Sequence, residues 1–99
     1  MYLDRFSNKI KGLCYKYNVR HLFAFGSVVT DKFSDKSDID LLVDINSTDP
    51  IDYAENYFEL KFELEKLLNR QIDMLEERAL QNPFLKASID SSKMKIYGD

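Results

Sequence analysis

The order in which hydrophobic patterns follow one another along the chain is what most constrains its fold. Apolar residues recur every three or four positions over residues 3–17 and again, after Pro50, over residues 53–67. Between these segments lie two short and almost wholly apolar runs, Val19–Phe25 and Ile39–Ile45. A period of three to four residues predicts a helix with one buried face, and a short apolar run predicts a strand buried on both faces. The alternation predicts a small α/β protein with helices packed on a sheet.

Weaker patterns complete the predicted fold. Asn69-Arg70 ends the second helix, and Gln71–Leu75 is a candidate third strand. Phe84–Ile89 follows a proline and predicts a helical turn or two. Met94–Tyr97 predicts a terminal strand.

Chain length and net charge limit the number of domains and the kinds of partner that we expect. A chain of 99 residues predicts one domain over residues 1–99, since domains run to roughly 100–150 residues. The formal net charge of −3 argues against a surface that neutralises nucleic-acid phosphates. The sequence offers neither a signal sequence nor a membrane span, so we expect a cytoplasmic protein. Cys14 is the only cysteine, so we expect no internal disulfide and place Cys14 in the core.

The candidate chemistry lies in one motif: Gly26-Ser27, ten further residues, and then Asp38-Ile39-Asp40. By itself Asp-x-Asp carries little information, because a chain with 11 Asp residues contains about one by chance. Requiring Gly-Ser at one fixed offset lowers the chance expectation to about 0.003. The combined motif is therefore specific, whereas its second half alone is not.

Asp38 and Asp40 point to the same face of their predicted strand, because side chains two residues apart on a strand do so. Two adjacent carboxylates require cations. Oxygen ligands of this kind suit Mg²⁺, which is commonly shared between carboxylates and the phosphates of a substrate. Asp44 has the same parity but lies roughly 13 Å further along the strand, so we exclude it as a ligand.

A third carboxylate and a phosphate-binding loop would complete the site. Asp73 lies between two apolar residues of the third candidate strand, so its side chain alternates onto the opposite face, where it can join Asp38 and Asp40. Gly26 lets the backbone approach phosphate oxygens, and Ser27 offers a hydroxyl and can cap a short helix whose N–H groups face an anion. Together these residues predict a nucleotide site with two metal ions.

The segments Gly26-Ser27 and Asp38–Val43 resemble the signature of the DNA polymerase β-type nucleotidyltransferase superfamily. The length of the chain is similar to that of the minimal, single-domain branch. This resemblance implies a small mixed β-sheet packed by helices. It also implies a nucleotidyltransferase that moves a nucleoside monophosphate to an acceptor hydroxyl, with pyrophosphate leaving, by two-metal in-line displacement.

The resemblance also implies roles for individual residues. Asp38 and Asp40 would bridge two Mg²⁺ ions, and Asp73 would hold the metal at the acceptor or take its proton. Gly26 and Ser27 would bind the β- and γ-phosphates. Minimal members usually pair with a helical HEPN-type toxin ribonuclease, which they adenylylate on a tyrosine. We therefore expect an antitoxin that moves AMP from ATP to a hydroxyl of such a partner, and the sequence leaves the nucleotide and the acceptor residue open.

A second interpretation stays open beside the enzymatic one. Many minimal members have an Arg and a Gly shortly after Gly-Ser, whereas Val28–Asp31 contains no cation. A weak or inactive nucleotide-binding module that neutralises its partner by direct contact is therefore the alternative. The complete Gly-Ser and Asp-x-Asp motif favours the enzyme, because contact alone would not require carboxylates that bridge metals.

Several candidate residues also have plain structural explanations. Asp38 follows a polar turn, and Asp73 is also explained as an ordinary exposed strand residue. His21 has no Ser or Cys partner placed by the sequence, so we expect a surface or structural role. We interpret three basic residues as solvated charges: Lys32, Lys36 and Arg78. The aromatic residues that could face a partner include Tyr2, Tyr15, Phe58 and Phe62.

Overall fold

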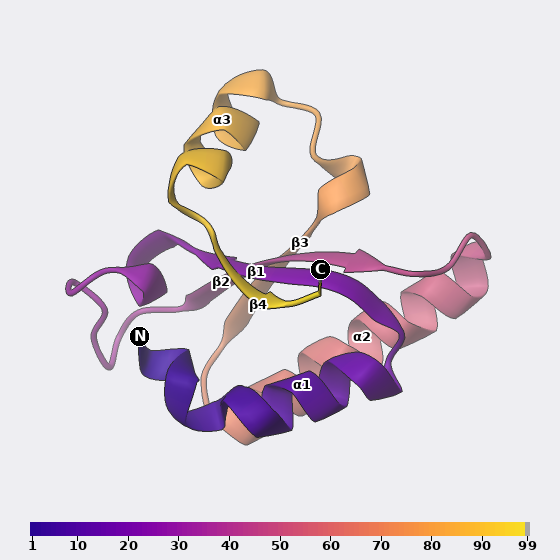
Figure 1. The fold of residues 1–99 in the computed structure, drawn as a ribbon, viewed down its shortest axis with the longest axis horizontal. Coiled ribbons are helices and arrows are strands. Elements are labelled where there is room, and N and C mark those ends of the chain that lie inside the picture. The colour runs from indigo at the N-terminus through magenta and orange to yellow at the C-terminus, as the bar shows by residue number, and fades with distance from the viewer. Residues whose placement is uncertain (99) are drawn as a thin grey trace.

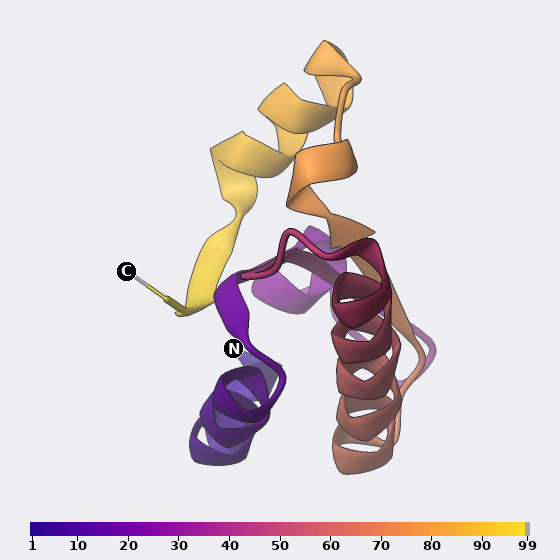
Figure 2. The same cartoon turned by 90° about the vertical axis from the view of Figure 1, so that its right-hand side faces the viewer.

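A four-stranded sheet divides the helices of this computed structural model into two layers (Figure 1). The structure describes residues 1–98. The strands are β1 (Val19–Phe25), β2 (Ile39–Ile45), β3 (Ile72–Glu76) and β4 (Met94–Tyr97). On one side of the sheet lie α1 (Ser7–Lys16) and α2 (Pro50–Leu68), and on the other side lies α3 (Pro83–Ser92) (Figure 2). Short 3₁₀ helices occupy Tyr2–Phe6, Gly26–Val29 and Glu77–Ala79.

The sheet is mixed, in the order β3-β2-β1-β4. β1 pairs antiparallel with β2 and with β4, while β2 and β3 are parallel. Parallel neighbours require a crossover, and α2 supplies it by carrying the chain back along the sheet. This arrangement confirms the predicted fold of a small mixed sheet packed by helices.

α2 has clear signals at both of its ends. The side chain of Asp49 accepts a hydrogen bond of 3.0 Å from the amide of Ile51, and Pro50 occupies the first turn. Asn69 follows the helix in the left-handed conformation, with φ at 51°. None of the helices within residues 1–98 is long and apolar enough to cross a membrane.

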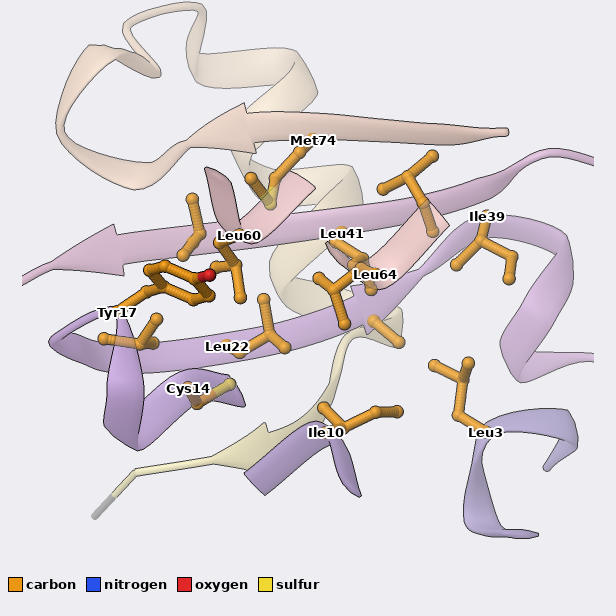
Figure 3. Packing of buried hydrophobic residues seen from close by; sticks show 14 of the residues in the cluster. Leu3, Ile10, Cys14, Tyr17, Leu22, Ile39, Leu41, Leu60, Leu64 and Met74 are labelled. Carbon is orange, nitrogen blue, oxygen red and sulfur yellow. The ribbon is translucent and has the colours of Figure 1, made fainter. Parts of the chain in front are cut away.

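The main core lies between the sheet and the pair α1 and α2 (Figure 3). Alternate residues of β2, namely Ile39, Leu41, Val43 and Ile45, face this core and are fully buried. They meet Leu60 and Leu64 of α2 and Ile10 of α1. Leu42 and Ile89 are also buried but lie outside that cluster, between the opposite face of the sheet and α3.

Four sequence-based expectations about the elements need correction. β1 is fully buried on one face only, because α3 covers the second face incompletely. The first helical segment is a 3₁₀ helix followed by α1 rather than one continuous helix. β3 lies one residue further along the chain than expected. α3 is longer than predicted: it begins at Pro83, where the side chain of Asn82 accepts hydrogen bonds from two amides of the first turn, and it continues to Ser92.

Cys14 is completely buried in this core, as predicted, and burial raises the pKa of its thiol to about 12. The nucleophile in thiol chemistry is the thiolate, so the folded chain presents neither access nor the reactive form. We expect no reaction with a thiol reagent such as Ellman's reagent at pH 8 until the chain unfolds. The rate measured over a urea series should follow the unfolded fraction, and rapid labelling without urea would contradict the placement of Cys14.

Candidate active site

Three aspartates meet at the beginning of two parallel strands. Asp38 immediately precedes β2, and Asp40 is its second residue. Asp73 of β3 is the register partner of Asp40, and neighbouring strands lie about 4.8 Å apart. The residues flanking them in the strands, such as Ile39 and Ile72, are buried in the main core, so the aspartates face the opposite side. The structure therefore brings together all three predicted carboxylates.

The position of Asp73 is held by α2 from behind the sheet. The amide of Ile72 donates a hydrogen bond of 3.1 Å to the carboxylate of Glu65. The hydroxyl of Tyr57 donates a hydrogen bond to the carbonyl of Met74. Both neighbours of Asp73 are thus tied to the long helix, which fixes the register in which Asp73 faces the β2 carboxylates.

The charges of the cluster affect the pKa of Asp40. Partial burial raises the pKa of its carboxyl above the ordinary range, and the negative charges of Asp73 and Asp38 raise it further. The two neighbouring negative charges therefore disfavour the ionised form of Asp40. A bound cation would reverse this effect, because it favours the ionised form of each ligand.

Gly26 lies directly against Asp40. Phe25, the last residue of β1, pairs with Asp40, and Gly26 follows with φ at +72°, a conformation that other residues rarely adopt. A Cβ atom at this position would lie 2.4 Å from Oδ2 of Asp40. Only a glycine lets the backbone pass the carboxylate at this distance, so the two halves of the sequence motif are in contact.

Ser27 lies within the 3₁₀ helix that begins at Gly26, so its predicted role as a helix cap is wrong. Phe25 occupies the capping position, and no side chain caps the turn there. The carbonyl of Ser27 accepts hydrogen bonds from the amide and hydroxyl of Thr30, at 2.9 and 2.8 Å. Val28 is buried in the core. Within residues 1–98 the hydroxyl of Ser27 makes no hydrogen bond, which leaves it available to a ligand.

The carboxylate oxygens of the three aspartates are ligands of the kind that Mg²⁺ prefers. Within residues 1–98, no group of three His, Cys, Asp or Glu side chains is arranged to hold a metal ion by itself. Mg²⁺ prefers oxygen ligands and commonly takes only one or two carboxylates, with waters and substrate phosphates completing its shell. The carboxylates of Asp38, Asp40 and Asp73, with the Gly26 backbone against Asp40, match that requirement.

Arg70 is a residue of this region that the sequence reasoning missed. Its Nη1 donates to the carbonyls of Ser34 and Ser37, at 2.9 and 2.8 Å, in the loop that leads to Asp38. Its guanidinium stacks on the rings of Phe33 and Tyr2, 4.5 and 5.2 Å from their centroids. The side chain is only 15% exposed. Arg70 thus holds the entry to β2, and Tyr2 belongs to this cluster rather than to a surface set.

We expect Arg70→Met to lower the free energy of unfolding by about 1–2 kcal/mol, because two carbonyl acceptors lose their donor and two rings lose a stacked cation. Amide hydrogen exchange in residues 34–39 should accelerate. Lys36→Met removes an exposed cation from the same loop and is the matched control, with changes below about 0.5 kcal/mol. Equal exchange in both variants would show that Arg70 does not hold the loop.

Asp44 lies at the other end of β2 and is part of a separate ion-pair network. It accepts hydrogen bonds from Arg78 at 3.0 Å and from Arg20 at 3.3 Å. Arg78 also donates to the carbonyl of Ile45 and stacks on Tyr53. Arg78 is exposed, as predicted, but its charge is paired within the fold rather than only solvated. Asp44 acts in the fold, which agrees with its exclusion as a metal ligand.

The remaining basic candidates are peripheral. His21 lies in β1, and its Nδ1 is 4.0 Å from a carboxylate oxygen of Glu77. Lys32 and Lys36 are exposed in the loop before β2, as expected. The sequence signal that could have identified Arg70 is weak, because an arginine just after a helix has many structural roles.

Comparison with known proteins agrees with this fold. The family model of polymerase beta nucleotidyltransferases matches residues 8–99. "Putative protein adenylyltransferase MJ0128" of Methanocaldococcus jannaschii is 39% identical over 81 residues, which are 82% of this chain and 80% of that protein. A solved structure described as a "putative minimal nucleotidyltransferase" has a TM-score of 0.76 at 27% identity and covers 93% of this chain and 90% of its own.

A further solved structure has the same fold at lower identity. It is the complex of a tri-AMPylated Shewanella oneidensis HEPN toxin with an MNT antitoxin, with a TM-score of 0.68 at 22% identity. The match covers 100% of this chain and 74% of that one. From its motif, its fold and these relatives, the chain is a minimal nucleotidyltransferase and belongs to the polymerase β nucleotidyltransferase family.

Proposed function

We propose that this nucleotidyltransferase is a Mg²⁺-dependent protein adenylyltransferase. It transfers AMP from ATP to a hydroxyl of a helical HEPN-type partner in the cytoplasm and thereby acts as an antitoxin. The observation that carries the proposal is the register of Asp40 with Asp73, with Asp38 on the same face and Gly26 in contact. The adenylyltransferase name of the relative supports the choice of AMP, and the AMPylated HEPN toxin bound to an MNT antitoxin supports the partner.

The three carboxylates and the loop at Gly26 have different roles in the proposed reaction. Asp38 and Asp40 would hold two Mg²⁺ ions, with Asp73 at the acceptor side. When bound, these ions neutralise the triphosphate and lower the pKa of the acceptor hydroxyl. The acceptor oxygen forms a bond to the α-phosphorus as the bond to pyrophosphate breaks, and Asp73 takes the proton of the hydroxyl. The backbone N–H groups at Gly26 and Ser27 and the hydroxyl of Ser27 would donate hydrogen bonds to the β- and γ-phosphates.

The exposure of the site favours a large acceptor. Asp38 and Asp73 are both exposed, and Asp40 is half-buried. An acceptor hydroxyl on the surface of another protein can reach carboxylates placed in this way. A small acceptor is instead usually enclosed by a pocket that covers most of its surface.

The alternative function is neutralisation by contact without transfer. The specific observation in its favour is the absence of a cation from residues 28–31 of the loop. In the structure Val28 belongs to the core and Thr30 closes the turn, so these positions serve the fold. The carboxylate cluster gives the enzyme the stronger support.

Intact mass spectrometry of the partner that co-purifies with the chain tests the proposal, before and after addition of MgATP. We expect the partner to gain one or more AMP masses with the wild-type chain and none with the Asp38→Asn/Asp40→Asn double variant. Chelation of Mg²⁺ should have the same effect as the double variant. A competent, unmodified partner that both forms bind and silence equally would instead establish the contact-only alternative.

A further inference from the structure

The outward side of α2 has an apolar stripe that lies outside the hydrophobic core. Ile51, Phe58 and Phe62 are 72%, 59% and 71% exposed, respectively. Spacings of seven and four residues place them along one line of the helix, over about three turns. Leu60 and Leu64, on the opposite side of the same helix, supply the core contacts. Single exposed apolar residues are ordinary, but three on one line of a helix, two of them phenylalanines, indicate a contact surface.

One flank of this stripe is acidic. Asp52, Glu55 and Glu59 lie beside it, and none of them forms an ion pair within residues 1–98. Other carboxylates of α2 do have partners: Glu63 lies 3.8 Å from Lys66, and Glu65 accepts the amide of Ile72. The three free carboxylates and the apolar stripe together are named the α2 outer face. Its charge complements a basic partner.

A groove continues the α2 outer face beside Phe58. It has a volume of about 340 Å³ and lies between the first half of α2 and the residues at the end of β3. Asp49 and Glu76 line it, together with Arg78, whose guanidinium is already paired with Asp44. The groove can take one side chain of a partner, and the unpaired charge around it is acidic.

We propose that the α2 outer face docks a basic amphipathic helix of the partner protein, with apolar residues at positions i, i+4 and i+7 and Lys or Arg along one flank. The proposal rests on the proposed function, in which the partner is helical. α2 packs on one face of the sheet (Figure 2). Asp40 and Asp73 face the other side, because their strand neighbours are buried in the main core. A helix docked there leaves the carboxylate cluster open to the acceptor.

The charge of the surface argues against two other occupants. In a symmetric pair of copies, each α2 outer face would meet the same acidic flank, and like charges would oppose one another. An anionic lipid surface would be repelled for the same reason. A basic helix is the occupant that both satisfies the carboxylates and covers the phenylalanines.

A synthetic helical peptide of about 18 residues tests the proposal, with leucines at i, i+4, i+7 and i+11 and lysines along one flank. Fluorescence anisotropy of the labelled peptide measures its binding to the full chain. We expect Phe58→Ser/Phe62→Ser to weaken binding at least tenfold and Glu55→Gln/Glu59→Gln to weaken it about fivefold, with a weaker dependence on salt. A peptide with glutamates in place of the lysines should not bind.

Two control variants test whether the loss of peptide binding is specific to the α2 outer face. Tyr15→Ser removes an aromatic side chain of α1 that is 82% exposed, and it should leave the affinity unchanged. Asp38→Asn/Asp40→Asn should also bind the peptide like the wild type, so failure of AMP transfer and failure of docking are separate results. Circular dichroism establishes that each variant is folded before its affinity is compared.

The proposal is overturned if folded Phe58→Ser/Phe62→Ser binds the lysine peptide as tightly as Tyr15→Ser does. It is also overturned if the glutamate peptide binds equally well, because the acidic flank then has no role. Sedimentation of the chain alone tests the remaining occupant. A wild-type dimer that Phe58→Ser/Phe62→Ser converts to a monomer would assign the surface to a second copy.

Discussion

We expect Asp40→Asn to reduce AMP transfer by at least about 1,000-fold and, in the absence of Mg²⁺, to raise the melting temperature by about 2–4 °C. The loss follows from the proposed metal-holding role, because stabilisation by a metal contributes several kcal/mol to the transition state. The gain follows from the raised pKa of Asp40, which reflects burial and the nearby Asp73 and Asp38 charges. A screened repulsion of about 0.5 kcal/mol corresponds to such a temperature shift in a domain of this size.

The dependence of the unfolding free energy on pH tests the predicted gain in stability. Because the folded state raises the pKa of Asp40, it binds the proton more tightly than the unfolded state does. The contribution of Asp40 to the free energy of unfolding therefore decreases as the pH rises from the ordinary carboxyl value, about 3.9, through the raised one. Below that range both states are protonated, and wild type and Asp40→Asn should differ least.

Thermal unfolding between pH 3 and 8 and a mass-spectrometric transfer assay measure the two effects. Asp31→Asn removes an exposed carboxylate from the loop before β2 and is the matched control, which should change neither quantity. Added Mg²⁺ and ATP should stabilise the wild type more than Asp40→Asn. Near-normal transfer by Asp40→Asn would remove the proposed mechanism, and a lower melting temperature would show that the carboxylate stabilises the metal-free fold.

Gly26→Ala is expected to have the second largest effect, with a loss of transfer of at least about 100-fold and a loss of about 1–3 kcal/mol of unfolding free energy. The new Cβ would lie 2.4 Å from Oδ2 of Asp40, and φ at +72° strains any residue with a side chain. The carboxylate or the turn must therefore move. Either movement separates the loop that is proposed to bind the phosphates from the residues that are proposed to hold the metal.

Gly12→Ala is the matched control, because a Cβ at this position in α1 would have no atom within 4 Å. It should leave transfer unchanged and raise the unfolding free energy by about 0.5–1 kcal/mol, since alanine is the better helix former. Urea denaturation and the transfer assay compare the two variants directly. If Gly26→Ala behaves like Gly12→Ala, the contact between Gly26 and Asp40 is not essential.

Much of the fold and of the candidate site could be predicted from local patterns. The bounds of β1, β2 and β4 agree with the apolar runs, because a short run bounded by polar residues has little freedom to shift. The shared face of Asp38 and Asp40 follows from the two-residue period of a strand. The side on which Asp73 lies follows from its buried neighbours Ile72 and Met74.

Other features depend on contacts between elements that the local pattern does not encode. The pairing of Asp40 with Asp73 is a matter of strand register, which the crossover through α2 and its bonds to Ile72 and Met74 decide. The hydrogen-bond acceptors of Arg70 and Arg78 lie more than thirty residues away in the chain, so the roles of these residues could not be inferred from their neighbours.

The sequence by itself indicated most of the elements, the buried face of β2 and the carboxylates proposed for the site, because helical and strand periods are local properties of a chain. The tertiary structure decided which of those groups touch. Gly26 meets Asp40 only because β1 and β2 pair antiparallel in one register, which brings the end of one strand to the beginning of the next. That register is set by the packing of the whole core, and it turns two separate sequence motifs into one candidate active site.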